Sequence, residues 1–177
     1  MTQIVTQYPE PRRAFLVAGL AAMLAACAGP GGGRRGTVAG AEGHGSISVH
    51  PERRGDVVLT ALSLLESKYR YGGSHPQSGF DCSGLVAYVF NHSARQRLPH
   101  NTEQIAQLSR KISRRQLRGG DFVFFNTLNR PYSHMGIYIG EGKFVNAPSS
   151  GGRVRIDSLD NPYFARRFDS ARTLFSS

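Results

Sequence analysis

The pattern of apolar positions predicts helices before residue 110 and strands after residue 120. Apolar residues recur at helical spacing in 56–69, and Asp56 stands where an N-terminal cap would lie. A second apolar segment, 82–90, begins beside Asp81. The segment 101–108 opens on NTEQ, which is a capping-box pattern. These segments predict three helices joined by loops rich in turn-forming residues.

After residue 120 the apolar pattern changes to a period of two, which is typical of strands. In the segment 134–139, Met135, Ile137 and Ile139 face one way. Further strands are predicted at 121–125, 143–147 and 154–156. Because helices come first and antiparallel strands follow, the chain is predicted to have an α+β fold.

The turn at 140–142 decides which side chains of its two strands share a face. A three-residue loop there would put Gly136 opposite Asn146, and Asn146 would become the diagonal same-face neighbour of His134. A two-residue loop would put His134 and Asn146 on opposite faces. The length of the loop therefore determines whether these two polar side chains can meet.

The N-terminus has the pattern of an export signal. Two arginines precede the apolar stretch 14–26, which is too short to cross a bilayer as a permanent anchor. The stretch ends in LAAC, with Cys27 last, and this resembles the lipobox of bacterial lipoproteins. That resemblance implies cleavage of the signal peptide 1–26 and lipidation of Cys27. The alternative is an ordinary cleaved signal with an incidental cysteine.

A segment poor in large apolar residues follows the signal. Residues 28–55 contain nine glycines, so we expect 27–55 to be a lipidated cysteine followed by a flexible tether. The globular domain is then expected to occupy 56–177. We find no internal repeat.

Composition excludes several classes of protein. The chain has 177 residues, a net charge of +10 and only two cysteines, which excludes a disulfide scaffold and a multi-cysteine zinc ribbon. Its arginines lie in scattered pairs without interleaved aromatic residues, so we expect no nucleic-acid partner. No HExxH motif or cysteine cluster is present, and we expect neither a metal nor a cofactor.

Three residues carry candidate chemistry. Cys82 follows Asp81 at a predicted helix start, where backbone N–H groups favour the thiolate and lower its pKa. His134 is a candidate base for a cysteine nucleophile, and Asn146 could orient its imidazole. Each also has a plainer interpretation: Cys82 as a small buried residue, His134 as a solvent-facing strand residue, and Asn146 as a turn or edge residue.

Six motifs occur in an order that resembles the NlpC-type papain-like cysteine peptidases, which hydrolyse bacterial cell-wall peptides. They are YRYGG (69–73), GFDCSGLV (79–86), LP (98–99), RGGDFVFF (118–125), HMGIYIG (134–140) and FVNA (144–147). The resemblance spans about residues 57–175. It implies N-terminal helices packed on an antiparallel sheet of about five strands, with the nucleophile at a helix N-terminus.

The resemblance also implies a catalytic triad at Cys82, His134 and Asn146. The third member is often His in this family, whereas papain-like enzymes use Asn. The family's active-site tyrosine falls on Tyr69, whose hydroxyl would help the Cys82 backbone N–H to bind the oxyanion.

The residues that flank the nucleophile, Asp81 and Ser83, match the family pattern. Their role is left open between helix capping and contact with polar groups of the substrate. His100 departs from the arginine that is common in the family after Leu-Pro.

The resemblance implies a peptidoglycan hydrolase that cleaves stem peptides, with the bond from the γ-carboxyl of D-glutamate to the diamino acid as the usual one. Ala28 after Cys27 fits a lipoprotein anchored in the outer membrane and facing the periplasm. Two alternatives stay open: a catalytically weak wall-binding or regulatory lipoprotein, and an acyltransferase or thioesterase on the same fold. The sequence identifies no regulatory protein partner.

Overall fold

The structure is a computed structural model that describes residues 47–150 and 152–177. The signal peptide expected at 1–26, the lipidated Cys27 and the first part of the expected tether lie outside the described residues. Within the part that is described, no helix is long and apolar enough to cross a membrane.

Helix α1 (Arg54–Ser63) begins and ends earlier than the pattern predicted. Arg53 occupies the N-cap position, and the expected cap residue Asp56 accepts a hydrogen bond from the Arg53 side chain instead, at 3.1 Å. The helix stops because the following backbone pairs with a distant segment. The N–H of Glu66 donates to the carbonyl of Val154 at 3.0 Å. Tertiary pairing therefore overrides the helical pattern after Ser63.

The other two helices begin where the sequence predicted. Helix α2 (Cys82–Ser93) is capped by Asp81, and helix α3 (Thr102–Leu108) is capped by Asn101. Between α1 and α2, the segment expected to be a loop contains a small hairpin of β1 (Ser74–His75) and β2 (Gly79–Phe80). This hairpin leads the chain directly into Cys82.

Six strands form one sheet in the order β3-β8-β4-β5-β6-β7, and every neighbouring pair is antiparallel. The strands are β3 (Arg110–Ile112), β4 (Phe122–Phe125), β5 (His134–Gly140), β6 (Lys143–Asn146), β7 (Arg155–Ser158) and β8 (Phe168–Thr173). The sequence analysis missed β3, which is short, and β8, in which polar residues occupy four of the six positions. The predicted α+β architecture is confirmed.

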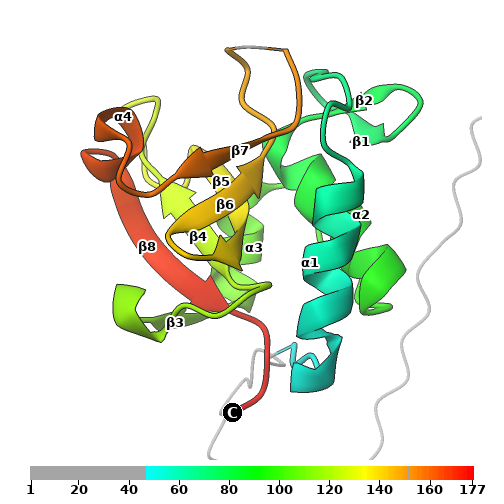
Figure 1. The fold of residues 1–177 in the computed structure, drawn as a ribbon, viewed down its shortest axis with the longest axis vertical. Coiled ribbons are helices and arrows are strands. Elements are labelled where there is room, and N and C mark those ends of the chain that lie inside the picture. The colour runs from blue at the N-terminus through cyan, green and yellow to red at the C-terminus, as the bar shows by residue number, and fades with distance from the viewer. Residues whose placement is uncertain (1–46, 151) are drawn as a thin grey trace, which may run out of the picture. The chain divides into compact units, whose positions relative to one another are not determined.

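Strand β4 is buried on both faces, which explains its continuous apolar sequence. Phe122 and Phe124 join the core that also contains the buried residues of α1 and α2. Val123 and Phe125 lie in a second cluster with Phe164 of the short helix α4 (Pro162–Ala165). Figure 1 shows α1 and α2 together on one side of the sheet. The sheet is therefore held between two apolar layers.

The β5–β6 hairpin reaches the expected register by an unexpected route. Gly140 pairs with Lys143, so the loop has two residues, Glu141 and Gly142, both with positive φ. A shift in register between Tyr138 and Gly140 adds one residue to β5 and offsets the shorter loop. Tyr138 therefore pairs with Phe144, which is the register that the three-residue loop would also have produced.

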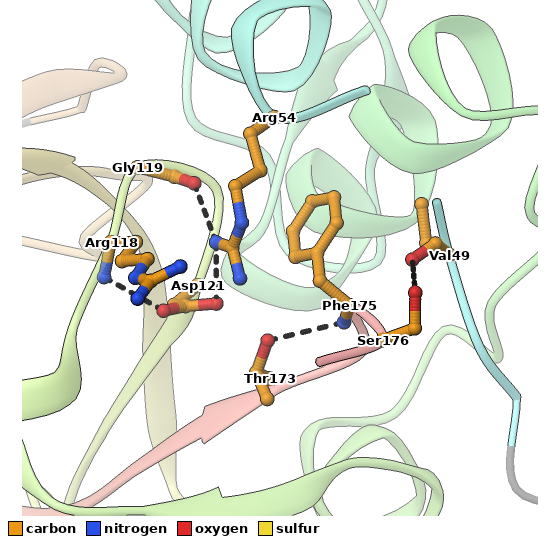
Figure 2. Close-up of polar contacts among 8 residues, drawn as sticks. All are labelled: Val49, Arg54, Arg118, Gly119, Asp121, Thr173, Phe175 and Ser176. Atoms are coloured by element: carbon orange, nitrogen blue, oxygen red, sulfur yellow. Dashed lines mark hydrogen bonds and ion pairs between the residues drawn. The ribbon is translucent and has the colours of Figure 1, made fainter. Parts of the chain in front are cut away.

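The folded domain includes residues before position 56, where it was expected to begin. Val49 is buried and pairs with the C-terminal segment, since its N–H donates to the Leu174 carbonyl at 2.8 Å. Arg54 donates to Asp121 at 2.9 Å and packs over the ring of Phe175 at 4.0 Å (Figure 2). The expected tether therefore extends too far, because the last residues of 27–55 belong to the domain.

Candidate active site

Cys82 is the first residue of α2 and lines a cleft of about 460 Å³. Its position is set by the cap of the helix, because the Gly84 N–H donates to the Asp81 carboxylate at 2.8 Å. The thiol is only partly exposed. His134, the first residue of β5, lines the same cleft. Helix α2 and strand β5 thus bring the predicted nucleophile and the predicted base to one cavity.

His134 and Asn146 form the contact that the hairpin register predicted. The His134 Nε2 atom lies 3.0 Å from the Asn146 Oδ1 atom. Asn146 is fully buried, and His134 is 8% exposed. The ring of Phe164 stacks on the imidazole, with the ring centroids 6.2 Å apart. Because Nε2 is hydrogen-bonded to the Asn146 amide, Nδ1 is the ring nitrogen that remains to accept a proton from the thiol.

The thiol lies against the first peptide of β5. A hydrogen bond from the Met135 backbone N–H lowers the pKa of Cys82, as do those from Ser83 and from Cys82 itself. Burial and the negative charge of Asp81 act in the opposite direction and outweigh them. The net effect raises the pKa of Cys82 to about 11. The expected lowering by the helix N-terminus is therefore wrong in its net direction.

Burial also lowers the pKa of His134, although the hydrogen bond to Asn146 and the charge of Asp157 raise it in part. Both directions favour neutral groups, a thiol and an uncharged imidazole that line the same cleft. A thiolate–imidazolium ion pair is therefore not the state that these pKa shifts favour.

We expect the alkylation of Cys82 to depend steeply on pH. Only the thiolate reacts, and a thiol with a pKa of about 11 gains thiolate about tenfold per pH unit below that value. The rate constant with iodoacetamide should therefore increase about a hundredfold from pH 7 to pH 9, without a plateau. Mass spectrometry of the Cys27→Ser chain, which keeps Cys82 as its single cysteine, measures this rate. A plateau near neutral pH would instead demonstrate an ion pair with His134.

Tyr69 lines the same cleft as Cys82 and His134. Burial and the nearby charges of Cys82 and Asp81 raise the pKa of its phenol. The hydroxyl therefore stays protonated and can donate a hydrogen bond to a negatively charged oxygen.

Asp81 organises the backbone around the nucleophile. Besides capping α2, its carboxylate accepts from the Gly72 N–H at 2.9 Å and contacts the His100 Nε2 atom at 2.7 Å. Ser83 donates its hydroxyl to Asp81 at 3.2 Å. Asp81 thus has the capping role that was considered for it, and Ser83 supports Asp81. Both side chains also line the cleft.

Sequence reasoning missed two residues of β7 that belong to this site. Asp157 accepts a hydrogen bond from the Asn146 side chain at 2.9 Å, and Arg155 donates to the same carboxylate oxygen at 2.9 Å. Their i, i+2 spacing was the available signal, because it places them on one face once the strand predicted at 154–156 is extended to Asp157. Only the structure shows that β7 pairs with β6, and this pairing places that face of β7 next to Asn146.

A cysteine at a helix start, a histidine at the start of a strand and an asparagine on the next strand define a papain-like α+β domain. In the described part of the chain, no three His, Cys, Asp or Glu side chains are grouped so as to hold a metal ion. The model of the NlpC/P60 family matches residues 66–173. The chain belongs to the NlpC/P60 family.

Curated relatives and solved structures agree with this assignment. Murein DD-endopeptidase MepH of Escherichia coli (strain K12) is 40% identical over 118 residues, which cover 65% of this chain and 44% of that protein. Gamma-DL-glutamyl hydrolase of Bacillus subtilis (strain 168) is also 40% identical, over 64% of this chain and 29% of that protein. The chain thus matches about half or less of these relatives' lengths.

The NlpC/p60 domain of the peptidoglycan hydrolase SagA has a solved structure that superposes with a TM-score of 0.59 at 29% identity. The match covers 68% of this chain and 97% of that domain. The fold described above is therefore that of an NlpC/P60 domain.

Proposed function

We propose that this protein is a cysteine peptidase that hydrolyses amide bonds in the stem peptides of peptidoglycan. The observation that carries the proposal is the cleft that holds both the Cys82 thiol and the His134 imidazole, with Asn146 bound to the far nitrogen of the ring. The names of the relatives, a murein endopeptidase and a gamma-DL-glutamyl hydrolase, support the substrate class.

Acylation begins with the neutral pair. As the Cys82 sulfur attacks the amide carbonyl, the His134 Nδ1 atom takes the thiol proton, and Asn146 stabilises the imidazolium through Nε2–H. The carbonyl oxygen becomes an oxyanion that accepts hydrogen bonds from the Cys82 N–H and the Tyr69 hydroxyl. Such donors stabilise the negative charge that develops on the oxygen in the transition state. Losing one donor typically lowers the rate by about 10²–10³-fold.

The second half of the reaction restores the thiol. The tetrahedral intermediate breaks its C–N bond, and the imidazolium of His134 gives its proton to the leaving amine. A thioester of Cys82 remains. His134 then accepts a proton from water as the water attacks the thioester carbonyl, and the proton returns to the sulfur when the C–S bond breaks. The products are one carboxylic acid and one amine.

We propose the bond between the γ-carboxyl of D-glutamate and the diamino acid as the site of cleavage. Gamma-DL-glutamyl hydrolase, one of the 40% identical relatives, supports this choice. A second candidate is a bond between two D-configured centres in cross-linked wall, because two other relatives are named murein DD-endopeptidases. The two candidates differ in the masses of their products.

The test is digestion of purified muropeptides, cross-linked and uncross-linked, followed by mass spectrometry. Cleavage after D-glutamate yields a truncated muropeptide from both substrates. DD-cleavage instead separates cross-linked dimers and leaves the uncross-linked muropeptides intact. The proposal is supported by products that carry the mass of one added water and that the Cys82→Ala chain does not form. No product from a folded wild-type chain would overturn it and favour a wall-binding or regulatory protein. Turnover of lipid esters alone would favour an acyltransferase or thioesterase.

We further propose that the domain is tethered to the outer membrane, facing the periplasm, through lipid on Cys27 after removal of 1–26. The LAAC pattern supports this location, and so do the relatives that are named for action on murein. We expect Cys27→Ser to move the chain from the membrane fraction to the soluble periplasmic fraction. Fractionation and immunoblotting measure the change, with Cys82→Ser as the matched control. Unchanged membrane association of Cys27→Ser would refute the anchor.

A further inference from the structure

A chain of hydrogen bonds runs from His134 away from the cleft. His134 contacts the Asn146 Oδ1 atom at 3.0 Å, and the Asn146 Nδ2 atom donates to an oxygen of Asp157 at 2.9 Å. Arg155 donates its Nε–H to that same oxygen at 2.9 Å. Asp157 is only 14% exposed, so water competes little for its carboxylate. The mechanism above uses His134 and Asn146 and assigns nothing to Asp157.

The chemistry of these groups fixes the direction of every bond in the chain. An aspartate carboxylate only accepts hydrogen bonds, so it selects the NH₂ end of the Asn146 amide. The amide oxygen must then point to His134, and because that oxygen only accepts, the His134 Nε2 atom must carry a hydrogen. In a neutral imidazole the other nitrogen, Nδ1, then has the free lone pair.

We propose that Asp157 is a positioning residue that sets the tautomer of His134 through the orientation of the Asn146 amide. Without an acceptor at position 157, the amide of Asn146 can rotate by 180° and present NH₂ to the imidazole. His134 would then bind that NH₂ through an unprotonated Nε2 atom and carry its hydrogen on Nδ1. In that tautomer the ring cannot take the proton of Cys82.

Strand pairing places Asp157 for this task. Asn146 on β6 pairs with Arg155 on β7, so Asp157, two residues further along β7, is the diagonal same-face neighbour of Asn146. The Arg155 carbonyl offers Asn146 Nδ2 only a longer contact of 3.4 Å. The carboxylate of Asp157 is therefore the acceptor that orients the amide.

The test compares Asp157→Ala with Asp157→Asn in the full chain. The alanine variant removes the acceptor. The asparagine variant keeps one oxygen, which is sufficient because a single oxygen of Asp157 receives both Arg155 and Asn146. Asp160→Ala is the matched control, since Asp160 lies three residues further on and contacts Arg114 instead of Asn146.

The first readout is the tautomer of His134, measured from its ring nitrogens by ¹⁵N NMR at neutral pH and assigned with a His134→Gln sample. We expect Nε2–H in the wild type, Asp157→Asn and Asp160→Ala, and a mixture in Asp157→Ala. An Nδ1–H ring in the wild type would overturn the proposal, whether or not any variant folds. So would a pure Nε2–H ring in a folded Asp157→Ala chain.

The second readout is muropeptide hydrolysis, and this arm rests on the proposed function. We expect Asp157→Ala to lower kcat about ten- to hundredfold with KM little changed, since a wrong tautomer disables the base but Asn146 is still present. Asp157→Asn should stay near the wild type. Equal losses in both variants would show that the charge matters and the acceptor does not, which overturns the proposal. If the wild type hydrolyses no muropeptide, the proposed function fails, while the tautomer measurement still decides the role of Asp157.

Discussion

The replacement Cys82→Ala is expected to lower muropeptide hydrolysis by about 10⁴-fold or more. Alanine has no atom that can form the thioester, so the two-step route through an acyl-enzyme is lost. The oxyanion donors and the cleft remain, and they account for the small residual rate. The measurement is single-turnover digestion followed by mass spectrometry, together with a binding measurement that should show nearly unchanged affinity.

Cys27→Ser is the matched control for this experiment, because it removes the chain's other cysteine, which is the predicted lipidation site. It should hydrolyse muropeptides in solution at the wild-type rate. Loss of activity in Cys27→Ser with retention in Cys82→Ala would remove the basis for placing the nucleophile at the start of α2. The thermal midpoint of each variant separates loss of chemistry from loss of fold.

The replacement His134→Gln is expected to lower the rate of muropeptide hydrolysis at neutral pH by as much as Cys82→Ala does. With a pKa of about 11, Cys82 is only about 10⁻⁴ thiolate at pH 7 when no base takes its proton. The residual rate of His134→Gln should then rise about tenfold per pH unit from pH 7 to pH 9. A rate that stays flat over this range would show that the thiolate forms without His134.

Two further samples make this prediction specific. The double variant Cys82→Ala, His134→Gln should be no slower than Cys82→Ala alone, because residues that act as a unit are not additive. His92→Gln is the matched control, since His92 is exposed on α2 and its ring stacks on Tyr88 away from the cleft. It should keep the wild-type rate. A double variant much slower than Cys82→Ala would mean that His134 has a role apart from the thiol.

Local patterns predicted the structural setting of Cys82, the candidate nucleophile. Asp81 before an apolar helical segment is a capping signal, and the structure has Asp81 as the cap and Cys82 as the first residue of α2. The alternation after residue 133 predicted β5 and the face on which His134 lies. These features depend on neighbours within a few residues, which is the range over which side-chain type controls backbone conformation.

The predicted contact between His134 and Asn146 is present, although the loop beneath it differs from the one assumed. The two-residue turn would have separated them if β5 had no extra residue opposite β6. A bulge depends on how a whole hairpin packs, and the loop sequence alone does not reveal it. The end of α1 at Ser63 has a similar origin, because a backbone pairing with residues near 152–154 competes with the helix.

By itself, the sequence determined the order of helices and strands, the candidate triad and the family that these residues resemble. Only the tertiary structure decided the direction of the Cys82 pKa, the inclusion of Val49 in the domain and the place of Asp157 beside Asn146. The physical reason is the range of the interactions. Periodicity and capping act between near neighbours, whereas burial, strand register and the charges around a thiol depend on residues brought together from distant parts of the chain.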